Sequence, residues 1–114
     1  MEFLLLIYDQ EKRWTKLNEA QKGAETQEYD AFGKEFAKSI RGSSALQPTP
    51  AAKTVRVRNG KPQVTDGPFA ETKEQLGGYY LVEAKDAAEA VAIAAKIPWA
   101  RHGSVEVRPI LTFS

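Results

Sequence analysis

The feature that most limits how this chain can fold is a run of six apolar residues near its start, Phe3 to Tyr8. Its length suits a β-strand and is too short to cross a bilayer. The run is apolar at every position, not at alternate ones, so both faces of the strand need cover. Asp9 follows at once and no basic segment precedes the run, so we expect a cytoplasmic protein without a signal peptide.

A helix is predicted over residues 15–41, with Thr15 as its cap and Gly42 just after its end. Gly23 weakens this helix enough to allow a break there. Residues 43–47 have room only for a short strand before the loop that contains two prolines. The helical spacing places four large side chains on one face: Tyr29, Phe32, Phe36 and Ile40.

Residues 54–58 and 61–65 flank the pair Asn59-Gly60, which predicts a β-hairpin because both turn residues tolerate a positive φ. A two-residue turn sets the register and places four apolar residues on one face: Val55, Val57, Pro62 and Val64. Basic residues occupy much of the rest of the hairpin. We interpret them as a solvated surface and not as a nucleic-acid site, because aromatic residues are not interleaved with them.

The second half of the chain predicts a buried strand at residues 79–82 and a helix from Ala87 to Ile97, which Pro98 stops. Asp86 and Glu89 form a capping-box pattern at the start of that helix. A last strand covers residues 104–113, where apolar residues alternate. If the hairpin is set aside, the order is βαββαβ.

That order predicts an α+β fold of the ferredoxin-like type, with an inserted β-hairpin, in one domain spanning residues 1–114. Its two helices cover one face of an antiparallel sheet and leave the other face bare. The first strand is apolar on both faces, so the bare face needs a partner. A second copy of the chain, related by a two-fold axis, is the simplest cover, and we expect a homodimer.

Composition excludes several classes of site. The 114 residues include no cysteine and one histidine, so disulfide frameworks, thiolate metal sites and sites with two imidazoles are excluded. The sequence has no metal-ligand motif, no dinucleotide or phosphate loop and no serine-nucleophile elbow, so we expect no metal and no cofactor. A net charge of +1 argues against nucleic-acid binding, and no segment predicts membrane association.

Two groups could act as an acid–base pair. Asp66 opens a turn-rich loop that continues to Gln75, with Phe69 as its expected hydrophobic anchor, and His102 lies before the last strand. We expect Asp66 to orient the imidazole and His102 to move a proton. The alternatives stay open: Asp66 could simply cap a turn, and His102 could bond the carbonyls at a helix end. The expected ligand-binding residues are Tyr29, Lys73, Tyr79 and Arg101.

Residues 64–80, which include Asp66-Gly67-Pro68-Phe69, and residues 100–109 resemble the DGPF-domain branch of the YCII-related family. The resemblance covers nearly the whole chain and implies a dimeric α+β barrel. It leaves the activity open: relatives in the wider barrel group are mostly small-molecule enzymes, whereas some DGPF proteins are associated with extracytoplasmic-function sigma factors. The resemblance therefore implies a small-molecule enzyme or ligand binder, or alternatively a non-catalytic regulatory or sensor partner of a sigma factor. YCII proteins are proposed to use a histidine on the first helix, which this chain lacks, so only Asp66 and His102 remain as candidates.

Overall fold

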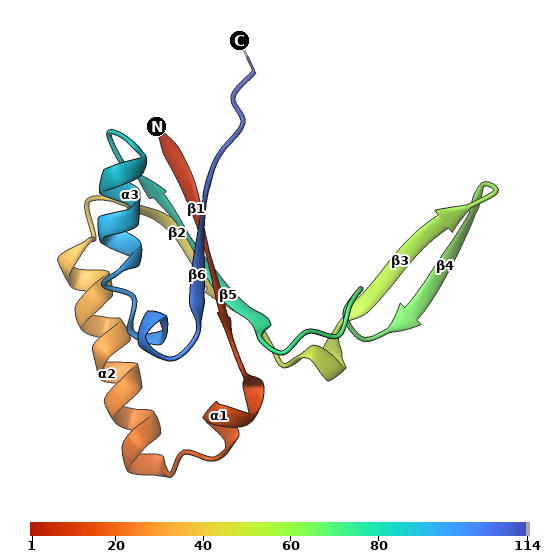
Figure 1. Ribbon diagram of the computed structural model, residues 1–114, viewed down its shortest axis with the longest axis horizontal. Helices are drawn as coiled ribbons and strands as arrows, with labels where there is room; N and C mark the ends of the chain where they lie inside the picture. The colour runs from red at the N-terminus through yellow and green to blue at the C-terminus, as the bar shows by residue number, and fades with distance from the viewer. Residues whose placement is uncertain (114) are drawn as a thin grey trace.

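The apolar run at the start of the chain forms an inner strand of a four-stranded antiparallel sheet (Figure 1). β1 (Glu2–Asp9) lies between β5 (Gln75–Glu83) and β6 (Ser104–Pro109), and β2 (Ile40–Ala45) pairs with the other edge of β5. The computed structural model describes residues 1–113. The strand order β2-β5-β1-β6, with helices between the strands, confirms the predicted α+β, ferredoxin-like fold.

Two helices, α2 (Glu19–Glu35) and α3 (Ala87–Ala94), cover one face of this sheet. Phe3, Leu5 and Ile7 point into that side and are buried, as the two-residue repeat of a strand requires. The residues between them are only half-buried, because no helix of the described residues covers the opposite face. Further core residues come from α2, from β5 and from α3 with the turn that follows it: Phe32, Val82, Ala90, Ile93, Ala94 and Ile97.

The first predicted helix is wrong at both ends. Thr15 ends a separate short helix, α1 (Glu11–Thr15), and α2 begins after Asn18. The Asn18 side chain accepts a hydrogen bond from the Gln21 backbone N–H at 2.8 Å, and the Gln21 side chain accepts one from the Asn18 N–H at 2.9 Å. This reciprocal cap fixes the start of α2, and the helix runs through Gly23 without a break.

The end of the chain also differs in detail. α3 stops at Ala94, and residues Pro98–Arg101 form a separate 3₁₀ turn, η2. The Asp86 side chain caps α3 as predicted, accepting from the Glu89 N–H at 2.9 Å. β6 ends at Pro109, so the predicted strand from 104 to 113 is too long.

The predicted hairpin is confirmed, with β3 (Lys53–Arg58) and β4 (Lys61–Asp66) in the expected register. Asn59 and Gly60 both have positive φ, 53° and 75°. The two strands form a sheet of their own, which we call the arm, residues 53–66. Figure 1 shows α2 and α3 on one side of the four-stranded sheet and the arm projecting on the other. A short 3₁₀ turn, η1 (Thr49–Ala51), precedes the arm.

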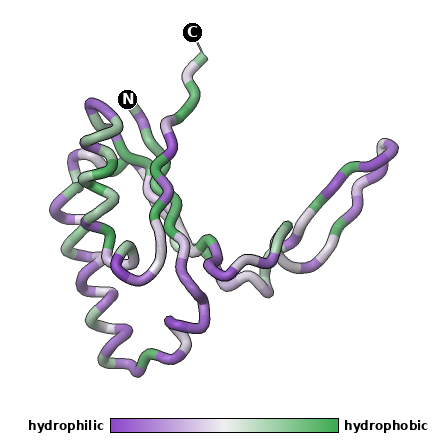
Figure 2. Tube along the Cα trace, in the orientation of Figure 1, coloured by the Kyte–Doolittle hydropathy of each residue, from purple (hydrophilic) through white to green (hydrophobic). Residues whose placement is uncertain are grey.

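Hydropathy follows this division of the chain. In Figure 2 the hydrophobic residues gather in the four-stranded sheet and in α3, whereas α2 is mostly hydrophilic and the arm alternates. In the part of the chain that the structure describes, no helix has both the length and the apolar character that a membrane crossing requires.

Candidate functional site

A buried ion cluster lies where β1 passes into α1. Asp9, at the end of β1, is 4% exposed, and Glu25 on α2 is 7% exposed. Arg13, one turn into α1, binds both carboxylates: its Nε donates to Asp9 Oδ2 at 2.6 Å and its Nη2 donates to Glu25 Oε1 at 2.9 Å. The cluster therefore joins a strand and two helices, and it holds two carboxylates against one guanidinium.

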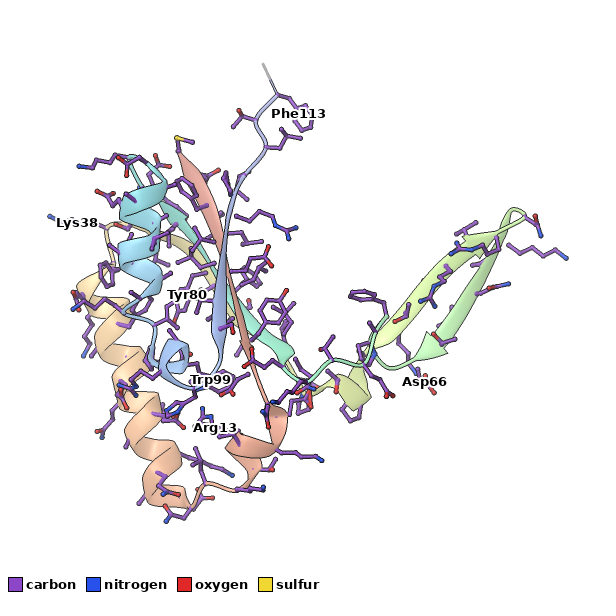
Figure 3. The ribbon with its side chains drawn as sticks, in the orientation of Figure 1. Arg13, Lys38, Asp66, Tyr80, Trp99 and Phe113 are labelled. Atoms are coloured by element: carbon purple, nitrogen blue, oxygen red, sulfur yellow. The ribbon has the colours of Figure 1, made fainter. Side chains whose placement is uncertain are left out.

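The environment of Arg13 keeps it charged. Burial by itself would lower the pKa of the guanidinium, but the hydrogen bonds to Glu25 and Asp9 outweigh burial and raise that pKa above its usual value. The guanidinium also lies over the Trp99 ring, with Cζ 5.5 Å from the ring centroid. Figure 3 shows Arg13 and Trp99 next to each other at the α1 end of the sheet.

Trp99, from η2, is the centre of an aromatic group. Trp14 lies 6.0 Å from it between ring centroids, and Tyr29 lies 6.1 Å away in an edge-to-face arrangement. The Trp99 Nε1–H group is buried and has no hydrogen-bond partner among the described residues. A buried donor without an acceptor is costly, and it indicates a place where a ligand or water oxygen could accept a hydrogen bond.

A cavity of about 820 Å³ opens between this aromatic group and the sheet. Residues of β1, α1, α2 and β5, the segment from Ser43 to Pro48, and Trp99 line it. Two glycines in β5 shape its wall. A Cβ on Gly77 would lie 3.0 Å from the Trp99 ring, and one on Gly78 would lie 2.9 Å from the Ser44 carbonyl oxygen. Larger residues at these positions would push Trp99 or β2 out of place.

Two tyrosine hydroxyls stay protonated beside this cavity. Burial raises the pKa of Tyr29, and a hydrogen bond with the Trp99 backbone offsets only part of that increase. Burial also raises the pKa of Tyr80. Both side chains line the cavity, so they offer neutral hydroxyl groups at ordinary pH.

The predicted binding residues fall into two sets. Tyr29 and Tyr79 line the cavity. Arg101 is exposed and pairs with Glu28 at 2.6 Å between Nη2 and Oε2, and Lys73 is exposed in the loop before β5. Neither Arg101 nor Lys73 belongs to the lining of the cavity.

The predicted acid–base pair is not brought together within one protomer. Asp66 ends β4 on the arm, where its side chain is 81% exposed and pairs with Lys53. His102 follows η2 in the body, by which we mean the described residues outside the arm, and is exposed. Figure 3 shows the arm carrying Asp66 well away from Trp99, which belongs to the turn just before His102. Their roles in proton transfer stay a prediction.

The loop after Asp66 closes the base of the arm. Gly67 adopts φ 94°, a conformation that favours glycine, and its N–H donates to the Ala52 carbonyl at 2.7 Å. The Thr54 hydroxyl donates to the Gly67 carbonyl at 2.8 Å. Phe69 is 80% exposed, so the expectation that it anchors the loop is wrong for the single chain. A smaller cavity of about 380 Å³ lies beside this loop.

The residues of the ion cluster and the tryptophans beside it were not predicted from the sequence: Asp9, Arg13, Trp14, Glu25 and Trp99. One signal was present, because Asp9 directly follows a buried strand and Arg13 lies four residues later, the spacing of a helical ion pair. Glu25 and Trp99 are far from them in the sequence, and only the packing of α2 and η2 brings them together. Among residues 1–113 no group of three or more carboxylate or imidazole side chains is placed to hold a metal ion.

Comparison with known proteins places the chain in a family. The profile of the YCII-related domain matches residues 1–114. The chain belongs to the YCII-related family. This YCII-related chain is 47% identical over 70 residues to an uncharacterized protein of Rhizobium meliloti (strain 1021). The match covers 60% of this chain and 56% of that relative, so it spans about half of the relative's length.

A solved structure has a similar fold. It is 5-chloro-2-hydroxyhydroquinone dehydrochlorinase from Burkholderia phenoliruptrix AC1100, in complex with 2,5-dihydroxybenzoquinone. The TM-score is 0.57 and the sequence identity 13%, over 97% of this chain and 94% of that one. At this identity the likeness supports the α+β fold and does not carry an activity across.

Proposed function

We propose that this YCII-related protein is a small-molecule enzyme or ligand binder whose ligand occupies the cavity beside Trp99. The observation that carries the proposal is a cavity with aromatic walls, lined by the two carboxylates of the buried ion cluster and by Trp99, whose Nε1–H has no partner among the described residues. Its volume, about 820 Å³, falls in the range of about 300–1,000 Å³ typical of ligand pockets.

The proposed ligand is a small planar ring that carries hydroxyl and carbonyl groups. Aromatic side chains such as Trp14 and Tyr80 suit the faces and edges of a planar ring. The Trp99 N–H suits a carbonyl oxygen, and the carboxylates of Asp9 and Glu25 suit hydroxyl hydrogens. The fold relative bound to 2,5-dihydroxybenzoquinone supports the choice of this class as the first to test.

We also propose that the functional unit is a homodimer formed through the uncovered face of the four-stranded sheet. Leu4 and Leu6 of β1 and Leu81 of β5 share that face, since Leu4 pairs with Leu81 across the strands. All three remain half-buried in the single chain. An Asp66–His102 pair would need the arm of a second copy, because the two residues lie apart in one chain. A cytoplasmic location, expected from the sequence, stays a prediction.

The two tryptophans of the chain allow a direct test, because Trp14 and Trp99 both line the cavity. We expect 2,5-dihydroxybenzoquinone to change their emission and to release or absorb heat in calorimetry. Trp99→Phe keeps an aromatic ring but removes the N–H donor, so it should weaken binding about tenfold, as expected for one lost hydrogen bond.

Two controls decide the outcome. Lys96→Ala changes an exposed residue outside the cavity and should leave quinone binding unchanged. If hydroxylated quinones and phenols cause no change in emission or heat at millimolar concentration, the small-molecule proposal is contradicted, and the regulatory alternative becomes the better one.

A further inference from the structure

The arm has an apolar face that nothing in the single chain covers. Every residue from Val55 to Asp66 is exposed, and Val55, Val57 and Val64 are 59%, 59% and 61% exposed. The strand register places these valines on one face together with Pro62. A lone two-stranded hairpin is marginally stable in water, so an ordered arm with such a face needs something to pack against.

The shape of the molecule indicates where a second chain that covers the valine face of the arm would lie. The radius of gyration is 16.1 Å, larger than the roughly 13 Å of a compact chain of this length. The arm projects on the side of the four-stranded sheet that α2 and α3 leave uncovered (Figure 1). A body that packed on the uncovered leucines of that sheet would therefore lie alongside the arm.

The charges of the arm and the body are complementary. Residues 53–66 carry four basic side chains and one acidic side chain, a net charge of +3. The whole chain has a net charge of +1, so the remainder carries −2. These opposite net charges favour contact between the arm of one copy and the body of another, and they disfavour a basic partner.

The base of the arm is fixed to the body. The Glu11 carboxylate, on α1, accepts hydrogen bonds from the Thr49 N–H at 2.8 Å and from the Thr49 hydroxyl at 3.2 Å. The Gln75 side-chain oxygen accepts from the Glu11 N–H at 3.0 Å. These bonds set the direction in which the arm leaves the body, so less freedom is lost when it docks.

We propose that the arm packs its valine face against the body of a second copy of this chain, which sits on the uncovered sheet face. Under two-fold symmetry the arm of the second copy does the same in return. This inference rests on the proposed homodimer and adds to it a second contact surface, made by the arm.

The test compares the dimer dissociation constants of variants by sedimentation equilibrium. The variant V55T/V57T/V64T makes the face polar but keeps β-branched side chains, so the hairpin should persist. Because three side chains that the proposed dimer buries would lose apolar contact, its dissociation constant should rise about tenfold or more. Gln63 lies on the other face of the hairpin, so the control variant Gln63→Thr should leave the dimer dissociation constant unchanged.

Hydrogen exchange of the arm amides gives a second measurement. These amides should be protected in the wild-type dimer and should lose protection when dilution separates the subunits. Leu6→Glu, on the uncovered sheet face, should also separate the subunits and expose the arm.

The outcomes separate the two proposals. If Leu6→Glu abolishes the dimer while V55T/V57T/V64T and wild type have equal constants and equal arm exchange, the homodimer stands and the arm proposal is overturned. If the wild-type chain is monomeric at all concentrations tested, both are overturned.

Discussion

Arg13 shows how one side chain can hold a site together. It neutralises one of two buried carboxylates and shares its hydrogen bonds between them, so neither Asp9 nor Glu25 is left without a partner. The Arg13 guanidinium also lies over the Trp99 ring, which connects the ion cluster to the aromatic wall of the cavity. The cluster thus supports the wall of the cavity and supplies two of the carboxylates that line it.

Arg13→Met should destabilise the fold by about 3 kcal/mol, because it leaves two buried carboxylates without their cation. Adding Glu25→Gln to that variant should recover about 1 kcal/mol or more, since one uncompensated charge is removed. Urea unfolding measures both. Lys12→Met, an exposed neighbour, should change stability by less than about 0.5 kcal/mol. A double variant less stable than Arg13→Met would contradict this account.

At the scale of helices and strands, predictions were right where residues close in sequence, such as a turn pair, specify the structure by themselves. The Asn59-Gly60 turn specifies its own register, so every predicted pair of the hairpin was confirmed. The start of α2 was predicted wrongly because the segment offers two side chains that can cap a helix, Thr15 and Asn18. The Thr15 hydroxyl instead donates to the Lys12 carbonyl inside α1, and Asn18 caps α2. The apolar spacing still identified the buried face of α2, with Phe32 in the core.

Two glycines provide a matched test of how the elements approach one another. A Cβ on Gly103 would lie 1.9 Å from the Tyr8 carbonyl oxygen, so Gly103→Ala must displace β1 or the turn before β6. We expect a loss of about 2–3 kcal/mol, as in other overpacked sites. Gly23, inside α2, has open space around it, so Gly23→Ala should stabilise by up to about 1 kcal/mol. Thermal unfolding of the two variants should give shifts of opposite sign; equal shifts would be inconsistent with this reading.

At the scale of the whole molecule, the α+β fold was predictable, whereas only Tyr29 and Tyr79 of the predicted site residues line the cavity. The element order and the apolar first strand were enough for the fold, because few arrangements satisfy both. The acid–base hypothesis combined Asp66, at the start of a turn-rich loop, with His102, just before the last strand. The hairpin forms a separate sheet and carries Asp66 away from the body, which the sequence pattern did not predict. The cavity, in turn, depends on Trp99 reaching Arg13, a contact between residues 86 positions apart that no local pattern encodes.

The pH dependence of global stability follows from the buried tyrosines. The pKa of Tyr29 and that of Tyr80 are raised in the folded chain, so the folded state holds their protons more tightly than the unfolded state does. Their contribution to stability is complete below the unfolded pKa of about 10 and is lost as the pH rises above it, by at most about 1.4 kcal/mol per pH unit for each group.

Urea unfolding between pH 8 and pH 11.5 should therefore show the free energy of unfolding falling above about pH 10. Tyr29→Phe has no proton to lose at this position and should flatten that fall. If Tyr29→Phe and wild type decline in parallel, the Tyr29 hydroxyl is hydrated in solution, and the cavity is more open to water than its aromatic walls indicate.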